Sequence, residues 1–238
     1  MKIFSKPKVL VCVLTGVERH NWINPYLALN LLTLAQDTRF TVEIEPVIDK
    51  HPVDFARNSC VVMARERKAD WLFMVDNDQC FEVNPLDALS AGLSKDVIGL
   101  PTMQGFNPAE LQAGREPIIP NFRTLEQPER DGEFFTVKQI GTGAMFINRR
   151  VWEKVRGPWF KTNQSEDEIR TPHAHGEDFY FCEWVQRHGL KVWAHGRVIP
   201  HWKNSEVSKV GMRLEILRQM AANGGHAPAK VEWGKKHG

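Results

Sequence analysis

The segment from Trp71 to Asp78 places two carboxylates at the end of an apolar run. Residues Trp71 to Val75 are all apolar, which is typical of a strand buried on both faces, as in a parallel sheet. Side chains two positions apart in an extended chain point the same way, so Asp76 and Asp78 are expected to converge where open α/β sheets bind ligands. Two carboxylates there suit Mg²⁺ or Mn²⁺ carrying a diphosphate. The alternative is a plain turn.

Further short motifs also contain residues that can do chemistry. A Gly-Thr-Gly turn lets the backbone approach a ligand closely, although a hairpin or a strand-to-helix connection explains it as well. Acidic residues at a helix start can serve a ligand, or they can favour the helix dipole and cap the helix. An arginine inside a helix can bind a phosphate, or it can be solvated and pair with Asp54. The motifs are Ala56-Arg57-Asn58, Gly141-Thr142-Gly143-Ala144 and Gly176-Glu177-Asp178-Phe179, followed later by Pro200-His201.

The elements that must position these residues follow from the hydrophobic pattern. Strands and helices alternate in the N-terminal part, which predicts crossover units and a largely parallel sheet. Residues 101–136 are rich in Pro, Gly, Asn and charge, so a substrate-facing loop is favoured over a poorly ordered insert. Residues 1–204 are expected to form one domain, and 205–238 a C-terminal helix and basic tail. Strands are expected at 9–14, 41–48, 71–75, 97–100, 137–140, 144–147, 191–194 and 197–199, and helices at 25–34, 54–67, 84–92, 178–188 and 205–222.

Composition sets broad limits on the class of protein. The chain has 238 residues, of which 42% are apolar and 25% charged, with a net charge of +2. These values fit one sizeable core and neither demand nor exclude a polyanionic partner. Cys12, Cys60, Cys80 and Cys182 lack paired short spacing, so buried thiols in a reducing compartment are favoured over disulfides or zinc. No segment approaches about 20 consecutive apolar residues, and the N-terminal apolar run is too short for a signal peptide, so a cytoplasmic protein without a membrane span is expected.

In their order along the chain, these motifs resemble the nucleotide-sugar-dependent glycosyltransferases of the GT-A fold, especially the broad family-two-like group. The resemblance covers most of the chain, residues 8–203. It implies a Rossmann-like α/β fold: a mostly parallel sheet flanked by helices, in a single domain with long acceptor-side loops. It also implies a hexosyl- or pentosyltransferase that uses Mn²⁺ or Mg²⁺ to move a sugar from a nucleotide diphosphate sugar, with a UDP-sugar favoured, to a hydroxyl. The cation would offset the charge that develops on the leaving diphosphate.

On the donor side, the resemblance implies one set of residues for the nucleotide and one for the metal, and Asp76 belongs to both. The loop after the first strand holds the nucleoside, and the Arg-Asn pair of the second helix faces the nucleotide. The implied nucleotide-binding residues are Thr15, Gly16, Arg57, Asn58 and Asp76, the last of which binds ribose or the metal. Asp78 is the implied direct metal ligand together with Asp76, and His201 matches a third ligand that many of these enzymes supply late in the chain.

On the acceptor side, Glu177 and Asp178 are the implied catalytic pair. In inverting members, the acid at the place of Asp178 takes the proton from the attacking hydroxyl as a general base, and in retaining relatives it orients a sugar. The resemblance also implies that Gly141, Thr142 and Gly143 contact the sugar. The stereochemistry stays open at this point.

Two other functions compete with the transferase. Sugar-1-phosphate nucleotidyltransferases share the architecture, but they carry a Gly-rich loop containing Arg after the first strand, whereas the loop at 15–20 has a single glycine. A non-catalytic sugar- or nucleotide-binding module on the same scaffold is disfavoured, because Asp76, Asp78, Asp178 and His201 are all present together.

The sequence says least about the acceptor. It is either a glycan or cell-surface precursor, or a hydroxymethylated DNA base, as in phage-type enzymes, which would act in the host cytoplasm. Late basic residues can contact DNA phosphates, although a solvated helix face and tail explain them as well. These residues are Arg213, Arg218, Lys230, Lys235 and Lys236. The identity of the sugar and the oligomeric state also stay open.

Overall fold

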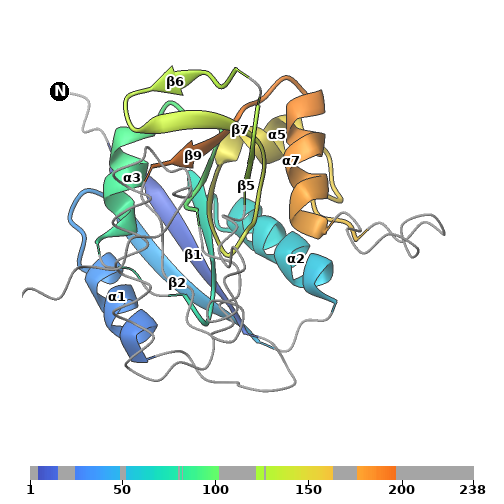
Figure 1. Cartoon of the computed structure of the whole chain (residues 1–238). Coiled ribbons are helices and arrows are strands. Elements are labelled where there is room, and N and C mark those ends of the chain that lie inside the picture. Colours follow the sequence, from blue (N-terminus) through green and yellow to red (C-terminus); the bar gives the residue numbers. More distant parts are fainter. Residues whose placement is uncertain are drawn as a thin grey trace, which may run out of the picture.

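The computed structural model describes residues 5–15, 25–48, 52–79, 81, 83–101, 122–125, 127–162 and 176–196. They form an α/β domain in which helices cover both faces of one sheet (Figure 1). The strands are β1 (Lys8–Thr15), β2 (Thr41–Ile48), β3 (Trp71–Asp76), β4 (Val97–Gly99), β5 (Phe122–Thr124), β6 (Arg130–Asp131), β7 (Phe134–Ile140), β8 (Ala144–Asn148) and β9 (Val192–His195). The helices are α1 (Pro25–Ala35), α2 (Val53–Glu66), α3 (Pro85–Ala91), α5 (Arg149–Lys154) and α7 (Glu177–Arg187).

The strands follow the order β2-β1-β3-β8-β4-β9-β7-β5, and β6 pairs with β7. β1 lies parallel to both β2 and β3, as expected for the N-terminal crossover units. β8 then enters antiparallel between β3 and β4, and β7 lies antiparallel to β9. The α/β class with flanking helices is confirmed, whereas the strand directions are mixed, not mostly parallel. An uninterrupted apolar run indicates that a strand is buried on both faces. An antiparallel strand in the middle of a sheet is buried in the same way, so the run does not indicate strand direction.

The sheet separates two apolar cores. Along β1, alternate side chains point to opposite faces, so Leu10 and Cys12 join different clusters from Val9 and Val11. The first pair packs with apolar residues of α2, α5 and α7, and the second pair with those of α1 and α3. Figure 1 shows the same division, with α1 and α3 on one side of the sheet and α2 and α7 on the other. The expected buried thiols are confirmed for Cys12, Cys60 and Cys182, and Cys80 lies outside the described residues.

Local signals explain most of the element boundaries. Asn84 caps α3, because its Oδ1 accepts a hydrogen bond from Leu86 N at 2.9 Å. Beyond α7, Gly189 adopts a φ of +71°, a conformation that glycine enters without a Cβ clash. The N-cap of α2 is Pro52, and Asp54 lies in the first turn of this helix.

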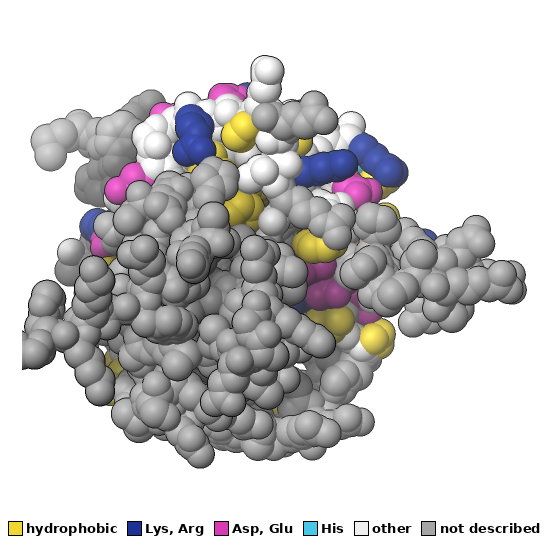
Figure 2. Space-filling view, in the orientation of Figure 1, with side chains coloured by type: hydrophobic (Ala, Val, Ile, Leu, Met, Phe, Trp, Pro, Cys, Tyr) yellow, Lys and Arg dark blue, Asp and Glu magenta, His cyan; other side chains and the backbone are white. Residues whose placement is uncertain are grey.

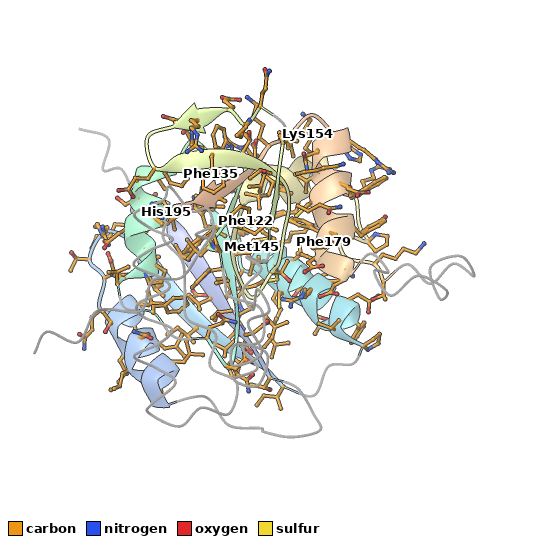
Figure 3. All side chains as sticks on the ribbon, viewed as in Figure 1. Phe122, Phe135, Met145, Lys154, Phe179 and His195 are labelled. Atoms are coloured by element: carbon orange, nitrogen blue, oxygen red, sulfur yellow. The ribbon has the colours of Figure 1, made fainter. Side chains whose placement is uncertain are left out.

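Three elements were not foreseen in the sequence. β5 and β6 lie inside the stretch expected to be an irregular loop, and α5 follows β8 directly. Phe122 of β5 packs edge-on against Phe135 of β7, with ring centroids 5.6 Å apart (Figure 3). The strand expected at 197–199, the helix expected at 205–222 and the boundary expected at 204 lie outside the described residues. Within the part of the chain that the structure describes, no helix is long and apolar enough to cross a membrane.

Candidate functional site

Arg57 on α2 lies at the centre of the site and is only 5% exposed. Its Nε donates to Glu177 Oε1 at 3.0 Å, and its Nη2 lies 3.3 Å from Asp76 Oδ1. Its Nη1 donates to the carbonyl oxygen of Thr142 at 3.4 Å. Burial alone would lower the pKa of Arg57, but the charges of Asp76 and Glu177 raise it above its ordinary value. A permanently charged guanidinium therefore joins α2, the end of β3, the turn before β8 and the start of α7.

Asp76 and Asp78 lie where β3 ends, as predicted. The backbone N–H of Asp76 donates to Gly143 O at 3.0 Å, and that of Asn77 donates to Leu14 O at 3.0 Å. These two bonds bring together the ends of β1 and β3 and the turn before β8. Gln79 N donates to Asp76 O at 3.1 Å, so a turn follows the strand directly. The turn that the sequence offered as the alternative to a metal site is therefore present, and Asp78 lies in this turn, not in the extended segment expected after Asp76.

The segment Gly141-Thr142-Gly143 connects two strands that are not neighbours. β7 pairs with β9, whereas β8 pairs with β3 and β4, so the alternative of a plain hairpin is wrong. A Cβ on Gly143 would lie 3.1 Å from Gln79 Nε2 and 3.4 Å from Asp76 Oδ2. Glycine at this position therefore leaves room for the Asp76 carboxylate and the Gln79 carboxamide. Thr142 itself is buried, and its Oγ1 has no hydrogen-bond partner within the described structure.

Asp178 lies in the first turn of α7, one residue after the arginine-bound Glu177. Burial, followed by the charge of Glu177, raises the pKa of Asp178 from 3.8 to about 6. Its Oδ1 accepts a hydrogen bond from Phe179 N at 2.8 Å, and Phe179 lies at the end of α7 nearest α2 (Figure 3). The N-cap of α7 is Gly176, so neither acid occupies the capping position. The two acids therefore differ in environment: one is ion-paired, and the other has a raised pKa near neutrality.

Asn58, next to Arg57, makes contacts of another kind. Its Oδ1 accepts from Trp159 N at 2.8 Å and from Phe160 N at 3.1 Å. Its Nδ2 donates to Phe160 O at 2.7 Å and to Asp54 O at 2.8 Å. The carboxamide thus joins α2 to the segment after α5, and its assignment to nucleotide binding stays a prediction.

The remaining predicted residues are placed only in part. Thr15 ends β1, is buried, and donates from Oγ1 to Val47 O at 3.4 Å. Gly16 and His201 lie outside the described residues. Asp54, the alternative partner of Arg57, instead accepts from the backbone of Phe55 at 2.9 Å and of Thr162 at 3.2 Å.

Among the described residues, Asp76 and Asp78 are the carboxylates that the sequence predicts as cation ligands. In this described part of the chain, no group of three or more His, Cys, Asp or Glu side chains could hold a metal ion. The donor set of Asp76 and Asp78 is hard and fits Mg²⁺ or Mn²⁺, although it is incomplete without further ligands. Figure 2 shows acidic side chains where α2 and α7 approach each other in Figure 1.

Sequence reasoning missed two features of this site. The first is the ion pair between Arg57 and Glu177, which are 120 positions apart in sequence. The second is Gln79, which is 1% exposed and has its Nε2 3.5 Å from Asp78 Oδ1. A glutamine directly after two aspartates was the available signal, but nothing in the sequence marked it as buried.

Comparisons with known proteins identify the fold and leave the family open. No protein-family model and no curated protein matches the chain. Among solved structures, A197 from STIV is 17% identical, with 79% of this chain and 81% of that chain covered and a TM-score of 0.51. The mannosyltransferase PcManGT from Pyrobaculum calidifontis, in complex with GDP-Man and Mn²⁺, is 10% identical. The match covers 94% of this chain and 67% of that chain, with a TM-score of 0.48. CMP:2-keto-3-deoxy-manno-octonic acid synthetase with CTP is 10% identical. The match covers 92% of this chain and 100% of that chain, with a TM-score of 0.45. The likeness to A197, the one of these three with a TM-score above 0.5, shows that the chain shares its α/β fold with that protein.

Proposed function

We propose that this chain is a metal-dependent glycosyltransferase that moves a sugar from a nucleotide diphosphate sugar, with a UDP-sugar favoured, to a hydroxyl acceptor. The observation that carries the proposal is the convergence of four separate segments around the buried Arg57. The convergence lies where β3 ends, which is the edge at which open α/β sheets bind ligands. It brings Asp76, a proposed metal ligand, together with Glu177, whose neighbour Asp178 has a pKa raised to about 6.

Asp76 and Asp78 would hold the cation, with His201 as the third protein ligand. Arg57 contacts Oδ1 of Asp76, while Oδ2 lies on the side of Gly143, so the two oxygens face different neighbours. When bound there, Mn²⁺ or Mg²⁺ supplies positive charge that offsets the charge developing on the leaving diphosphate. Thr15, Gly16 and the end of β3 would contact the nucleoside, and Gly141 to Gly143 the sugar.

Asp178 is the proposed general base. The acceptor oxygen attacks the anomeric carbon, the bond from that carbon to the diphosphate oxygen breaks, and the hydroxyl proton passes to the Asp178 carboxylate. A pKa of about 6 leaves Asp178 mostly ionised at pH 7, yet more basic than an ordinary aspartate. Direct displacement assisted by a base inverts the configuration at the anomeric carbon.

The test is donor hydrolysis and transfer with Mn²⁺, screened over UDP-, GDP- and TDP-sugars, for the wild type, Asp78→Ala and Asp178→Asn. We expect turnover by the wild type with one nucleotide class, and at least a hundredfold loss in both variants. Asp87→Ala is the matched control, because Asp87 on α3 pairs with Arg39 away from the site. A wild type that neither binds nor turns over any nucleotide sugar would contradict the proposal.

Two further arms separate the competing reactions and acceptors. Release of pyrophosphate from a nucleoside triphosphate and a sugar 1-phosphate would instead identify a nucleotidyltransferase. Transfer to hydroxymethylated duplex DNA, with salt-dependent retention on that DNA, would select the DNA acceptor over a glycan.

A further inference from the structure

We propose that Arg57 and Glu177 are positioning residues that fix the direction of the catalytic Asp178, and that neither contacts substrate. This assignment of roles rests on the proposed function and goes beyond it. It separates the roles of two adjacent acids, and it gives Arg57 a task other than binding the nucleotide.

The contacts of Arg57 support this assignment. All three nitrogens of its guanidinium make contacts within the protein: Nε with Glu177, Nη2 with Asp76 and the third with the Thr142 carbonyl. The residue is 5% exposed, so little of its surface is available to a phosphate or a base. A forked, planar cation that holds two carboxylates in place is a typical use of arginine over lysine.

The geometry of α7 links the position of the Glu177 side chain to the direction of the Asp178 side chain. Successive side chains of an α-helix diverge by about 100°, so fixing one side chain of the first turn also fixes the direction of the next. The N-cap, Gly176, has no side chain with which to hold that turn. The 3.0 Å contact of Glu177 with Arg57 is a side-chain contact that ties the start of α7 to α2.

The same contacts set the charge environment of Asp178. Burial is the largest cause that raises the pKa of Asp178, the charge of Glu177 from its own helix raises it further, and Arg57 from α2 lowers it. The buried thiol of Cys182 lies one turn further along α7. Replacing Glu177 by glutamine removes one negative charge but keeps an oxygen that can accept from Arg57. Replacing it by alanine removes both the charge and the contact. These two substitutions separate positioning from proton transfer.

The experiment compares Glu177→Gln, Glu177→Ala and Arg57→Lys with the wild type, measuring kcat, the KM of the donor and the pH profile. We expect kcat of Glu177→Gln within about threefold of wild type at pH 8, with its acid limb moved below about pH 6. In Glu177→Ala and Arg57→Lys, we expect kcat to fall about tenfold to hundredfold with little change in the donor KM. Arg67→Lys is the matched control, since Arg67 at the end of α2 pairs with Glu45 away from the site.

Two outcomes would overturn the assignment. A loss in Glu177→Gln as large as that in Asp178→Asn would make Glu177 the base. A raised donor KM with unchanged kcat in Arg57→Lys would make Arg57 a nucleotide contact. Both outcomes are measured against an active wild type. If the proposed function were wrong, the wild type itself would be inactive, and this result differs from either outcome.

Discussion

At the scale of single residues, the site depends on a glycine that has no Cβ. Gly176 adopts φ −60° and ψ 161°, angles that alanine also accepts, yet a Cβ there would lie 2.6 Å from Asp178 Oδ1. The helix can form without this glycine, but the Asp178 carboxylate cannot keep its place. Gly176 thus serves the position of Asp178 more than the backbone conformation.

Gly176→Ala should therefore damage turnover more than folding. We expect the free energy of unfolding to stay within about 1 kcal/mol of wild type, because alanine accepts these angles. Transfer should fall about tenfold or more, since the carboxylate must move. Urea unfolding and steady-state kinetics measure the two effects, with Gly196→Ala as the control, where a Cβ would lie 3.4 Å from Glu133 O. If the loss of transfer were fully explained by a fall in the free energy of unfolding, this role of Gly176 would be contradicted.

The raised pKa of Asp178 also predicts how stability depends on pH. Folding raises this pKa from 3.8 to about 6, so the folded state holds the proton more tightly than the unfolded state does. The resulting cost to the folded state is absent below pH 3.8 and fully developed above about pH 6. At 1.36 kcal/mol per unit, the shift corresponds to about 3 kcal/mol.

Asp178→Asn should thus be more stable than the wild type at pH 8 by about 2–3 kcal/mol, with a much smaller difference at pH 4. Urea unfolding of both proteins at the two pH values measures the change. A gain that is the same at both pH values would assign the effect to packing instead of charge.

The sequence predicts which residues meet at the site better than it predicts how they bond. The order of the motifs placed Arg57, Asp76, Thr142 and Glu177 at one site, and the structure brings them together. Spacing reports only local relations, such as two aspartates at a strand end. The ion pair between Arg57 and Glu177 depends on how α7 packs against α2, which no local pattern contains.

At the scale of elements, α2 is held in place by Asn58, the residue that follows Arg57 in the sequence. The four hydrogen bonds of Asn58 anchor the helix to residues 159 and 160 and to its own first turn. Arg57 is the preceding residue, so a shift of the helix at this point would move the guanidinium away from Asp76. The anchor and the ion pairs therefore act on the same segment of α2.

Asn58→Ala should destabilise the protein by about 2–4 kcal/mol, because it leaves part-buried backbone groups without their partners. Ser59→Ala is the control, since the Ser59 hydroxyl donates to Phe55 O within the same helix. Equilibrium urea unfolding of both variants at pH 7.5 gives the comparison. Weaker nucleotide binding without any loss of stability would instead favour a direct nucleotide contact by Asn58.

Element positions were predictable where the signal was local, and strand directions were not. The capped start of α3, the glycine after α7 and the apolar runs of β1 and β3 all have sequence signatures. β8 is as apolar as a parallel core strand, yet it runs antiparallel to β3. Direction is set by the path of the chain between strands, and β5 and β6 are too short to give a pattern.

At the scale of the whole molecule, the site draws on both ends of the described chain. β1 and β3 come from the N-terminal crossover units, whereas the turn before β8 and the start of α7 come much later. A ligand that bridges these parts binds the folded chain and not the unfolded one. Such a ligand stabilises the fold by mass action, and the stabilisation reports binding even when the acceptor is unidentified.

Thermal unfolding with Mn²⁺ and UDP tests this for the intact chain. At about 100 times the dissociation constant, a ligand adds about 2.7 kcal/mol, which for a chain of this size raises Tm by about 5–10 °C. We expect this increase with Mn²⁺ and UDP together and much less with either alone, because the cation links the carboxylates of Asp76 and Asp78 to the diphosphate. Asp78→Asn should abolish the increase, and Asp87→Asn, whose carboxylate pairs with Arg39, should keep it. An equal increase with UDP in the presence of EDTA would show that the nucleotide binds without a metal, and the role of the two aspartates as cation ligands would then be wrong.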